Sequence, residues 1–143
     1  GIQAITKGIE VSPVWAPVSW WQLKGSYSYL HLTARNKPTS DDASTVKQLE
    51  GDSPQHKVVV QSIFQLHKHV GLDLAYRYVS ALPDQQVRAY STGDVQLQWR
   101  FHPQWELSAV GRNLLQPHHA EFGGDNPLVE IKRSGYAKLT WTR

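Results

Sequence analysis

A chain of 143 residues can form one modest domain and is too short for two domains with separate cores. Cysteine is absent, which excludes a disulfide framework, and no apolar run is long enough for a membrane-spanning helix. The net charge is +3, but the cations are scattered among acidic residues, so no nucleic-acid partner is expected. The mean hydropathy of −0.47 resembles that of a soluble protein. It still allows a membrane barrel, in which half of each strand is polar.

Strict alternation of apolar and polar residues is the main pattern along the chain, and it predicts β-strands. In chain order the expected strands are residues 7–15, 20–35, 57–66, 70–79, 90–101, 105–112 and 134–143. The expected connections run short, long, short, medium, short and long: 16–19, 36–56, 67–69, 80–89, 102–104 and 116–133. Pro13 cannot donate to a strand ladder, so we expect a strand end or an unpaired position there.

The clearest alternation flanks the short break His102–Gln104, which predicts a hairpin with a three-residue loop. One face carries Val95, Leu97, Trp99 and Phe101, and after the break Trp105, Leu107, Ala109 and Gly111. A slip of one residue would move every side chain to the wrong face, so the register is well specified. The expected opposed pairs are Phe101 with Trp105, Trp99 with Leu107, Arg100 with Glu106, and Asp94 with Arg112.

The alternation of short and long connections is typical of membrane barrels, which have tight turns on the periplasmic side and longer loops outside. Strands of about ten residues also match the length of a tilted membrane span. We therefore predict an all-β fold: an antiparallel up-and-down transmembrane β-barrel segment of about seven strands, joined by alternating short turns and long loops.

Aromatic residues with one polar atom are abundant, with six Trp and six Tyr against three Phe, and such residues favour membrane interfaces. Near the short turns we expect a lipid-facing belt formed by Trp15, Trp21, Trp99, Phe101, Trp105 and Trp141. Near the long loops a second belt is expected from Tyr29, Tyr76, Tyr78 and Tyr136. The opposite face is expected to form a lumen wall carrying Lys24, Asp73, Arg77, Asp94, Arg100, Glu106 and Arg112.

Four stretches resemble the C-terminal end of TonB-dependent outer-membrane receptors, and the resemblance extends over essentially the whole chain. They are Y-S-T-G-D-V-Q-L-Q-W-R at 90–100, W-E-L-S-A-V-G-R-N-L-L at 105–115, H-A-E-F at 119–122 and S-G-Y-A-K-L-T-W at 134–141. Two features depart from the family: Gly93 replaces a larger apolar residue before the aspartate, and the chain ends on Trp141-Thr142-Arg143 rather than on an aromatic residue.

The resemblance implies that residues 1–143 are the C-terminal part of a barrel of about 22 strands, with the plug domain and the earlier strands outside this chain. Asn113–Leu115 would end the penultimate strand, Glu121 and Phe122 would lie in the last external loop, and Tyr136, Leu139 and Trp141 would lie on the closing strand. The implied location is the bacterial outer membrane.

The implied function is TonB-energised uptake of a scarce ligand such as a ferric siderophore. The implied partners are the remaining strands and plug of the same receptor, outer-membrane lipid, TonB through the plug, and a small-molecule ligand at the outer loops. The chain has no methionine and no signal peptide, so we expect it to be an excerpt or a processed product. An open sheet in lipid would leave two unpaired edges, which is costly, so we expect further strands to close the ring.

The alternative is a soluble β-sandwich that binds a ligand, for example a sugar, on an aromatic face. It predicts that Trp21, Trp99, Trp105 and Trp141 cluster inside a protein core.

No enzyme or cofactor is expected. The carboxylates Asp94 and Glu106 each have an arginine partner in the predicted register, and no nucleophile triad or phosphate-binding loop is present. The adjacent histidines His118 and His119 point in opposite directions in an extended chain, so with Glu121 they favour an ordinary loop over a metal site.

Overall fold

The computed structural model describes residues 2–37, 46, 53–122 and 129–143. The predicted loop 36–56 falls largely outside these residues, as does the middle of the loop 116–133. The described residues form ten β-strands: β1 (Ile2–Val11), β2 (Val14–Val18), β3 (Trp21–Asn36), β4 (His56–His67), β5 (Val70–Val79), β6 (Tyr90–His102), β7 (Trp105–Arg112), β8 (His118–Phe122), β9 (Val129–Lys132) and β10 (Ser134–Trp141). No helix in the described part of the chain has the length and hydrophobicity needed to cross a membrane.

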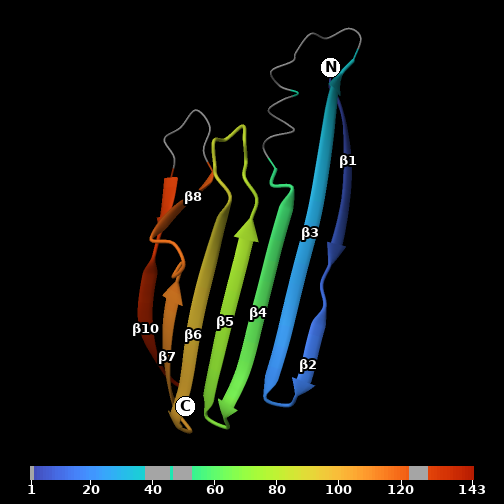
Figure 1. Cartoon of the computed structure of the whole chain (residues 1–143). Helices are drawn as coiled ribbons and strands as arrows, with labels where there is room; N and C mark the ends of the chain where they lie inside the picture. Colours follow the sequence, from blue (N-terminus) through green and yellow to red (C-terminus); the bar gives the residue numbers. More distant parts are fainter. Residues whose placement is uncertain (1, 38–45, 47–52, 123–128) are drawn as a thin grey trace.

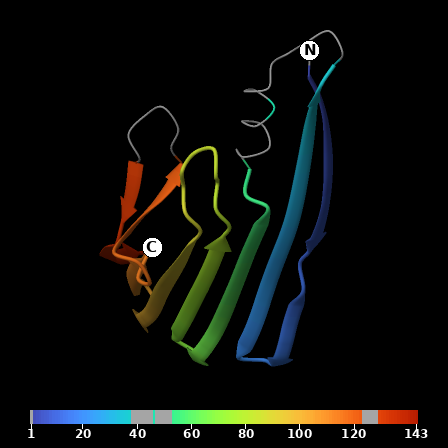
Figure 2. The same cartoon turned by 45° about the horizontal axis from the view of Figure 1, so that its top comes forward.

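Eight of these strands form one antiparallel sheet in which neighbours in sequence are neighbours in space. The order is β1-β3-β4-β5-β6-β7-β10, with β2 also paired to β3, while β8 and β9 form a separate hairpin. The sheet is a single curved layer with β1 and β10 at its open edges (Figures 1 and 2). The predicted all-β, up-and-down architecture is confirmed.

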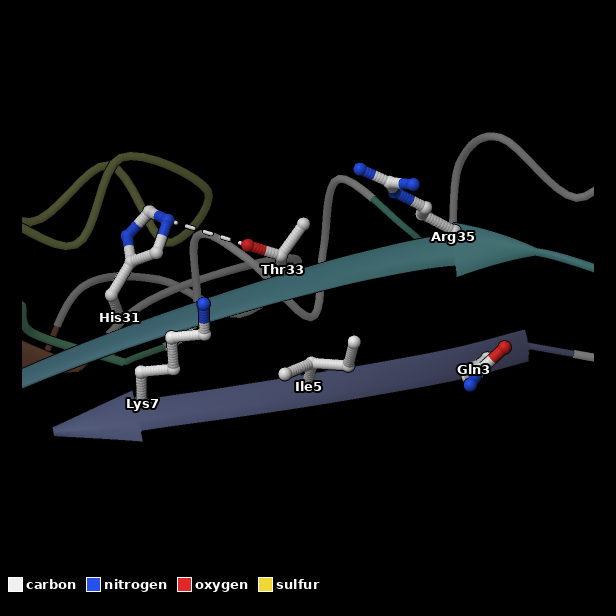
Figure 3. A pocket seen from close by; sticks show the side chains of 6 residues that line it. All are labelled: Gln3, Ile5, Lys7, His31, Thr33 and Arg35. Carbon is white, nitrogen blue, oxygen red and sulfur yellow. Dashed lines mark hydrogen bonds between the residues drawn. The ribbon is translucent and has the colours of Figure 1, made fainter.

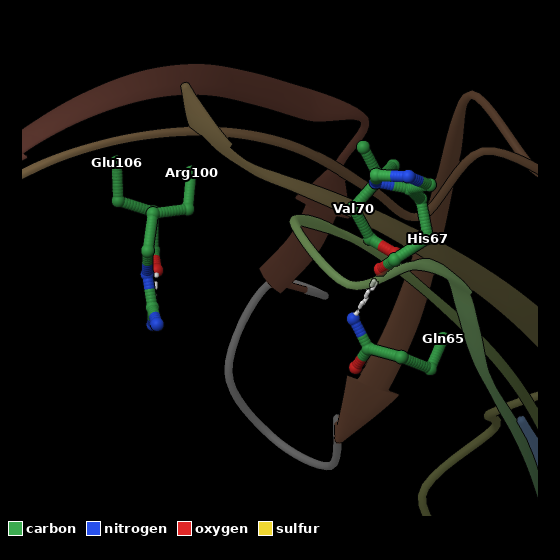
Figure 4. A network of polar contacts seen from close by, with 5 residues as sticks. All are labelled: Gln65, His67, Val70, Arg100 and Glu106. Atoms are coloured by element: carbon green, nitrogen blue, oxygen red, sulfur yellow. Dashed lines mark hydrogen bonds and ion pairs between the residues drawn. The ribbon is translucent and has the colours of Figure 1, made fainter. Parts of the chain in front are cut away.

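The short turns lie together at one end of the sheet, drawn at the bottom of Figure 1, and the longer connections lie at the other. Each short turn contains two residues: Ser19–Trp20, Lys68–His69 and Pro103–Gln104. The first turn was expected at residues 16–19, but β2 runs on to Val18, which pairs with Trp21. The side chain of Gln65 stabilises the second turn, because its amide donates to the carbonyl oxygens of His67 at 2.7 Å and Val70 at 3.3 Å (Figure 4).

The central hairpin has the predicted register along most of its length and a different one at its tip. Trp99 pairs with Leu107, and Val95 pairs with Gly111, as expected. At the tip, His102 pairs with Trp105, so Phe101 does not oppose Trp105 and that prediction is wrong. The cause is the turn: with two residues in place of three, one strand must contain a bulge, and the register shifts between Trp99 and His102.

The first predicted strand is divided at Ser12–Pro13 into β1 and β2. Pro13 has no N–H to donate, although its carbonyl oxygen still accepts a hydrogen bond from Gly25 N at 2.9 Å. The expected interruption at Pro13 is confirmed. It does not change the register, because Val11 pairs with Tyr27 and Val14 with Lys24.

The stretch 116–133 was predicted as a loop, yet it contains the hairpin β8–β9. This hairpin lies against the first residue of β6, where Tyr90 joins Val79, Leu82 and Val87 in a small buried cluster that Ala120 also contacts. Its strands are short and carry no long alternation, so they depend on tertiary contacts that local sequence does not reveal. The buried cluster lies at the end of the sheet opposite the short turns (Figure 1).

Candidate functional site: the two faces of the sheet

The apolar face of the sheet is almost uncovered. Trp15 is 57% exposed, Trp99 49% and Trp141 55%. No second sheet in the described part of the chain packs on this face, and the separate hairpin β8–β9 contacts Tyr90 instead. The sandwich alternative required Trp21, Trp99, Trp105 and Trp141 in a protein core. The structure leaves Trp99, Trp105 and Trp141 between 36% and 55% exposed instead.

The aromatic residues near the short turns contact one another, both across neighbouring strands and along β6. Trp15 and Trp21 meet edge to face at 5.5 Å, Trp99 and Phe101 lie 5.4 Å apart, and Trp105 and Trp141 lie 6.5 Å apart, all measured between ring centroids. All six residues of the predicted belt lie at this end, on β2, β3, β6, β7 and β10.

Sequence reasoning missed two members of this aromatic group. Phe64 stacks on Trp21 with centroids 5.9 Å apart, and Trp20 is half exposed in the turn beside it. The position of Phe64 on this face could have been predicted from the sequence, because Phe64 alternates in step with Val58 and Val60 on the same strand. The indole N–H of Trp21 donates to Ser62 Oγ at 2.8 Å, so its polar atom is satisfied within the sheet.

The tyrosines of the second belt are partly as expected. Tyr29 pairs with His56, and Tyr27 bonds through its hydroxyl to His56 Nδ1 at 3.0 Å. Tyr76 makes a hydroxyl contact with Ser91 Oγ at 3.0 Å. Tyr136 is an exception: it pairs with Val110 and lies on the opposite face from Leu139 and Trp141 of the same strand. Its assignment to the lipid-facing belt is wrong.

The polar face carries the seven charged residues predicted for the lumen wall, but most of them are spread along different strands. Arg100 and Glu106 are brought together, with Nη2 and Oε2 3.4 Å apart (Figure 4), as the register predicted. The Arg100 side chain is 59% exposed and that of Glu106 33%, so solvent screens this ion pair and it contributes little to stability. Other charged residues on this face lie opposite a neutral residue in the strand register: Lys24 opposite Gln61, Asp73 opposite Gln96, and Arg77 opposite Thr92.

The expected pair of Asp94 and Arg112 is replaced by two other contacts. Asp94 Oδ1 accepts a hydrogen bond from the backbone N–H of Asn113 at 2.9 Å. The guanidinium of Arg112 lies over the ring of Tyr136, 5.9 Å from its centroid. Asn113 has a positive φ of 56°, a conformation that asparagine tolerates, so Asp94 stabilises the point where the chain leaves β7.

Leu114 and Leu115, which follow that point, fold back onto the apolar face. Leu114 N donates to Gly93 O at 2.8 Å. A Cβ at Gly93 would lie 2.8 Å from Leu115 Cγ, and one at Gly111 would lie 3.2 Å from two carbons of Leu114. The absence of a side chain at both glycines therefore makes room for the two leucines, which explains the unusual Gly93.

A buried histidine lies beyond the sheet, on the side of the long connections. The side chain of His119 is 4% exposed, stacks on Tyr90 at 4.5 Å between centroids, and directs Nε2 toward Glu121 Oε1 at 3.1 Å. His118 instead approaches Glu130 at 3.9 Å, so the two adjacent histidines have different partners. In the described residues no group of three or more metal-binding side chains is arranged around a common point.

Two solved structures share this architecture. Against the ferric-catecholate import receptor Fiu from E. coli K12 in its closed form, the chain superposes with a TM-score of 0.70 at 17% identity, covering 95% of this chain and 20% of that one. For the open form of Fiu the TM-score is 0.67 at 16% identity, covering 96% and 21%. No family model and no curated protein matches the sequence.

The chain thus spans about one fifth of the length of that receptor. At this identity the similarity establishes the fold, and the predicted resemblance to a section of a TonB-dependent receptor is confirmed at that level. These neighbours are import receptors rather than enzymes.

Proposed function

We propose that residues 1–143 form the C-terminal section of the barrel of a bacterial outer-membrane receptor that imports a scarce ligand with energy supplied through TonB. The observation that supports this most strongly is the apolar face: a continuous row of exposed tryptophan, leucine and valine side chains on a single-layer sheet. In water so large an apolar surface would cause association, whereas lipid acyl chains cover it without cost.

The distribution of backbone partners supports the same conclusion. In the described part of the chain every inner strand of the sheet has hydrogen-bonded neighbours on both sides, and the open edges are β1 and β2 on one side and β10 on the other. Hydrocarbon offers no partner for the unpaired N–H and C=O groups of an edge. We infer that further strands of the same receptor pair with these edges and close the barrel.

The opposite face suits a water-filled lumen. It carries charged and amide side chains, including the solvent-exposed ion pair of Arg100 and Glu106. We propose that this face lines the passage and contacts the plug, and that the connections at the other end from the short turns contribute to ligand capture. By analogy with the import receptor of the same fold, the proposed cargo is a ferric siderophore of the catecholate class.

Iron uptake provides the test. Cells that produce the intact protein should accumulate radiolabelled iron presented as a ferric catecholate, and cells whose gene lacks the coding region for residues 1–143 should not. Inactivation of TonB in the producing cells is the control and should abolish accumulation. Iron accumulation that persists without residues 1–143 or without TonB would contradict the proposal. A protein that stays monomeric and folded in buffer without detergent would contradict it as well.

A further inference from the structure

The paired strands β1 and β3 extend beyond the rest of the sheet. β3 pairs with β4 only as far as Tyr29 and His56, and beyond that point its strand partner is β1 alone. Figure 1 shows these two strands reaching further toward the long connections than β4–β7. The projecting part is therefore a two-stranded ribbon, defined by residues 2–8 of β1 and 30–36 of β3.

The two faces of this ribbon exchange polarity where it leaves the sheet. On the outward face of β3 the row Trp21, Leu23, Tyr27 and Tyr29 is followed by His31, Thr33 and Arg35. On β1 the outward row runs from Ile9 to Lys7, Ile5 and Gln3, so this strand becomes mixed in polarity and keeps one apolar side chain. On the inward face the polar row that includes Lys24 is followed by Leu30, Leu32 and Ala34, and Ala34 is only 5% exposed. Such an exchange is expected where a strand leaves hydrocarbon and enters water.

A shallow groove of about 450 Å³ lies on the outward face of the ribbon. Its lining residues are Gln3, Ile5, Lys7, His31, Thr33 and Arg35. Figure 3 shows Lys7 and Ile5 on β1 and His31, Thr33 and Arg35 on β3, with the hydroxyl of Thr33 3.3 Å from His31 Nε2. We call this the outward groove.

The outward groove has an unbalanced positive charge. Among the described residues, its lining includes two full cations, Lys7 and Arg35, and no carboxylate. Neither cation belongs to an ion pair with a carboxylate in the described part of the chain. The carboxylate of Glu10 is on the other face, because Glu10 pairs with Ser28 while its neighbour Ile9 pairs with the outward-facing Tyr29. A phosphate group would satisfy these donors, and arginine and lysine both bind phosphate well.

The height of the groove matches lipid headgroups. Lys7 and His31 each lie two residues beyond the Ile9–Tyr29 pair, which is about 7 Å along the strands at about 3.3 Å per residue. The headgroup region on each side of a bilayer is roughly 5–8 Å thick. Lys7 and His31 therefore reach the headgroups. Arg35 lies four residues further, about 13 Å along the strand, and its guanidinium is directed back along the ribbon toward Thr33 (Figure 3), so it faces the outer, aqueous part of a headgroup that projects beyond Lys7.

We propose that the outward groove binds the phosphorylated headgroup of a membrane lipid, with Lys7 and Arg35 as its charge contacts and Thr33 and Gln3 as hydrogen-bonding neighbours. This inference rests on the proposed function, since it requires the sheet to span a bilayer with its long connections outside. The lipid headgroup lies beside the barrel, so the site is separate from any ligand-binding site in the lumen.

Lipid titration followed by native mass spectrometry tests the proposal on the intact protein in detergent. The probes are diphosphoryl lipid A, phosphatidylcholine and inorganic phosphate. At about 1 kcal/mol for each cation near an anionic lipid surface, the double variant K7Q/R35Q should bind lipid A roughly 25-fold more weakly. Its binding of phosphatidylcholine should not change.

Two matched variants distinguish the effect of lost charge on lipid binding from the effect of misfolding. The charge-conserving variant K7R/R35K should bind lipid A like the unmodified protein, which excludes misfolding as the cause of the loss. The variant K24Q/R77Q removes the same charges from the inward face and should leave lipid A binding unchanged. Equal losses in K7Q/R35Q and K24Q/R77Q, or no loss in either, would overturn the site. So would inorganic phosphate that displaces lipid A completely, since the groove would then hold a free anion.

The outcome is distinguishable from failure of the proposed function. If K7Q/R35Q retains full lipid A binding while iron uptake persists, only the lipid site is wrong. If uptake is absent but the unmodified protein binds lipid A through Lys7 and Arg35, the import function is wrong and the lipid site stands.

Discussion

The two ends of the sheet differ in how exposed their large apolar side chains are. Near the short turns and across the middle, large apolar side chains such as Trp99 and Leu97 remain exposed. Beyond the sheet, on the side of the long connections, Leu82, Val87 and Tyr90 are buried against one another and against Ala120. In the described part of the chain the buried apolar residues lie at the end of the sheet with the long connections. This supports the proposal that lipid takes the place of a protein core along the rest of the sheet.

A charge at the centre of the lipid-facing surface is expected to have the largest effect. Leu97→Arg should destabilise the membrane-inserted protein by about 2–4 kcal/mol, because the strand centre lies in hydrocarbon. Gln98→Arg, one residue further along β6, is the matched control and should have almost no effect, because its side chain lies on the opposite, polar face of the sheet, the proposed lumen wall. Urea unfolding in liposomes measures both, and equal effects would contradict the assignment of faces.

One substitution made at both ends sharpens the comparison. Leu82→Ala should cost about 2–3 kcal/mol, because it leaves a cavity in the buried cluster. Leu97→Ala should cost less than about 1 kcal/mol, since lipid chains are as apolar as leucine and fill the space. Hydrogen exchange at the amides of 82–90 and urea unfolding measure the two effects. A larger cost at Leu97 than at Leu82 would argue for a protein core on the apolar face.

Of these features, the sequence alone revealed what depends on local alternation. The seven predicted strands, the first of which is divided into β1 and β2, the Trp99–Leu107 pairing and the Arg100–Glu106 contact follow from period-two patterns. The bulges at the turns did not, because they depend on whether two or three residues form each turn. The face of Tyr136 could have been predicted, because residues an odd number of positions apart on a strand, such as Tyr136 and Leu139, lie on opposite faces; it was nevertheless misassigned from the sequence.

The contacts of Gly93 and β8 could not be predicted from local alternation, because they join parts of the chain that are distant in sequence. Leu115 packs over Gly93 although the two are far apart in sequence, and β8 is held by its contact with Tyr90. Neither relation leaves a local pattern, because both come from the way the chain folds back after Asn113. Such contacts become visible only when the sheet order is known.

The packing of Leu115 on Gly93 gives a prediction of intermediate size. Gly93→Ala should destabilise the protein by about 1 kcal/mol, because the new methyl group displaces the exposed Leu115 side chain. In the double variant G93A/L115A the two costs should be less than additive, since the clash is gone. The free energies of unfolding in liposomes of the two single variants and the double variant give the double-mutant cycle that tests this. Strict additivity would show that the two residues do not interact.

The smallest effect is expected for the exposed ion pair on the lumen face. Arg100→Ala and Glu106→Ala should each change stability by less than about 1 kcal/mol, and the coupling energy between them should be about 0.5 kcal/mol or less. Raising the salt concentration should reduce that coupling further. A double-mutant cycle measures it, and a coupling of several kcal/mol would mean that this pair is shielded from water.

Tryptophan quenching in a bilayer tests the central claim most directly. The intact protein is reconstituted in phosphatidylcholine vesicles whose acyl chains carry bromine near the headgroup, and its tryptophan emission is compared with that in unbrominated vesicles. If the apolar face meets lipid, brominated lipid should quench most of the emission and aqueous iodide should quench little. Emission that is insensitive to brominated lipid would show that these tryptophans do not face a membrane, and the account would be wrong.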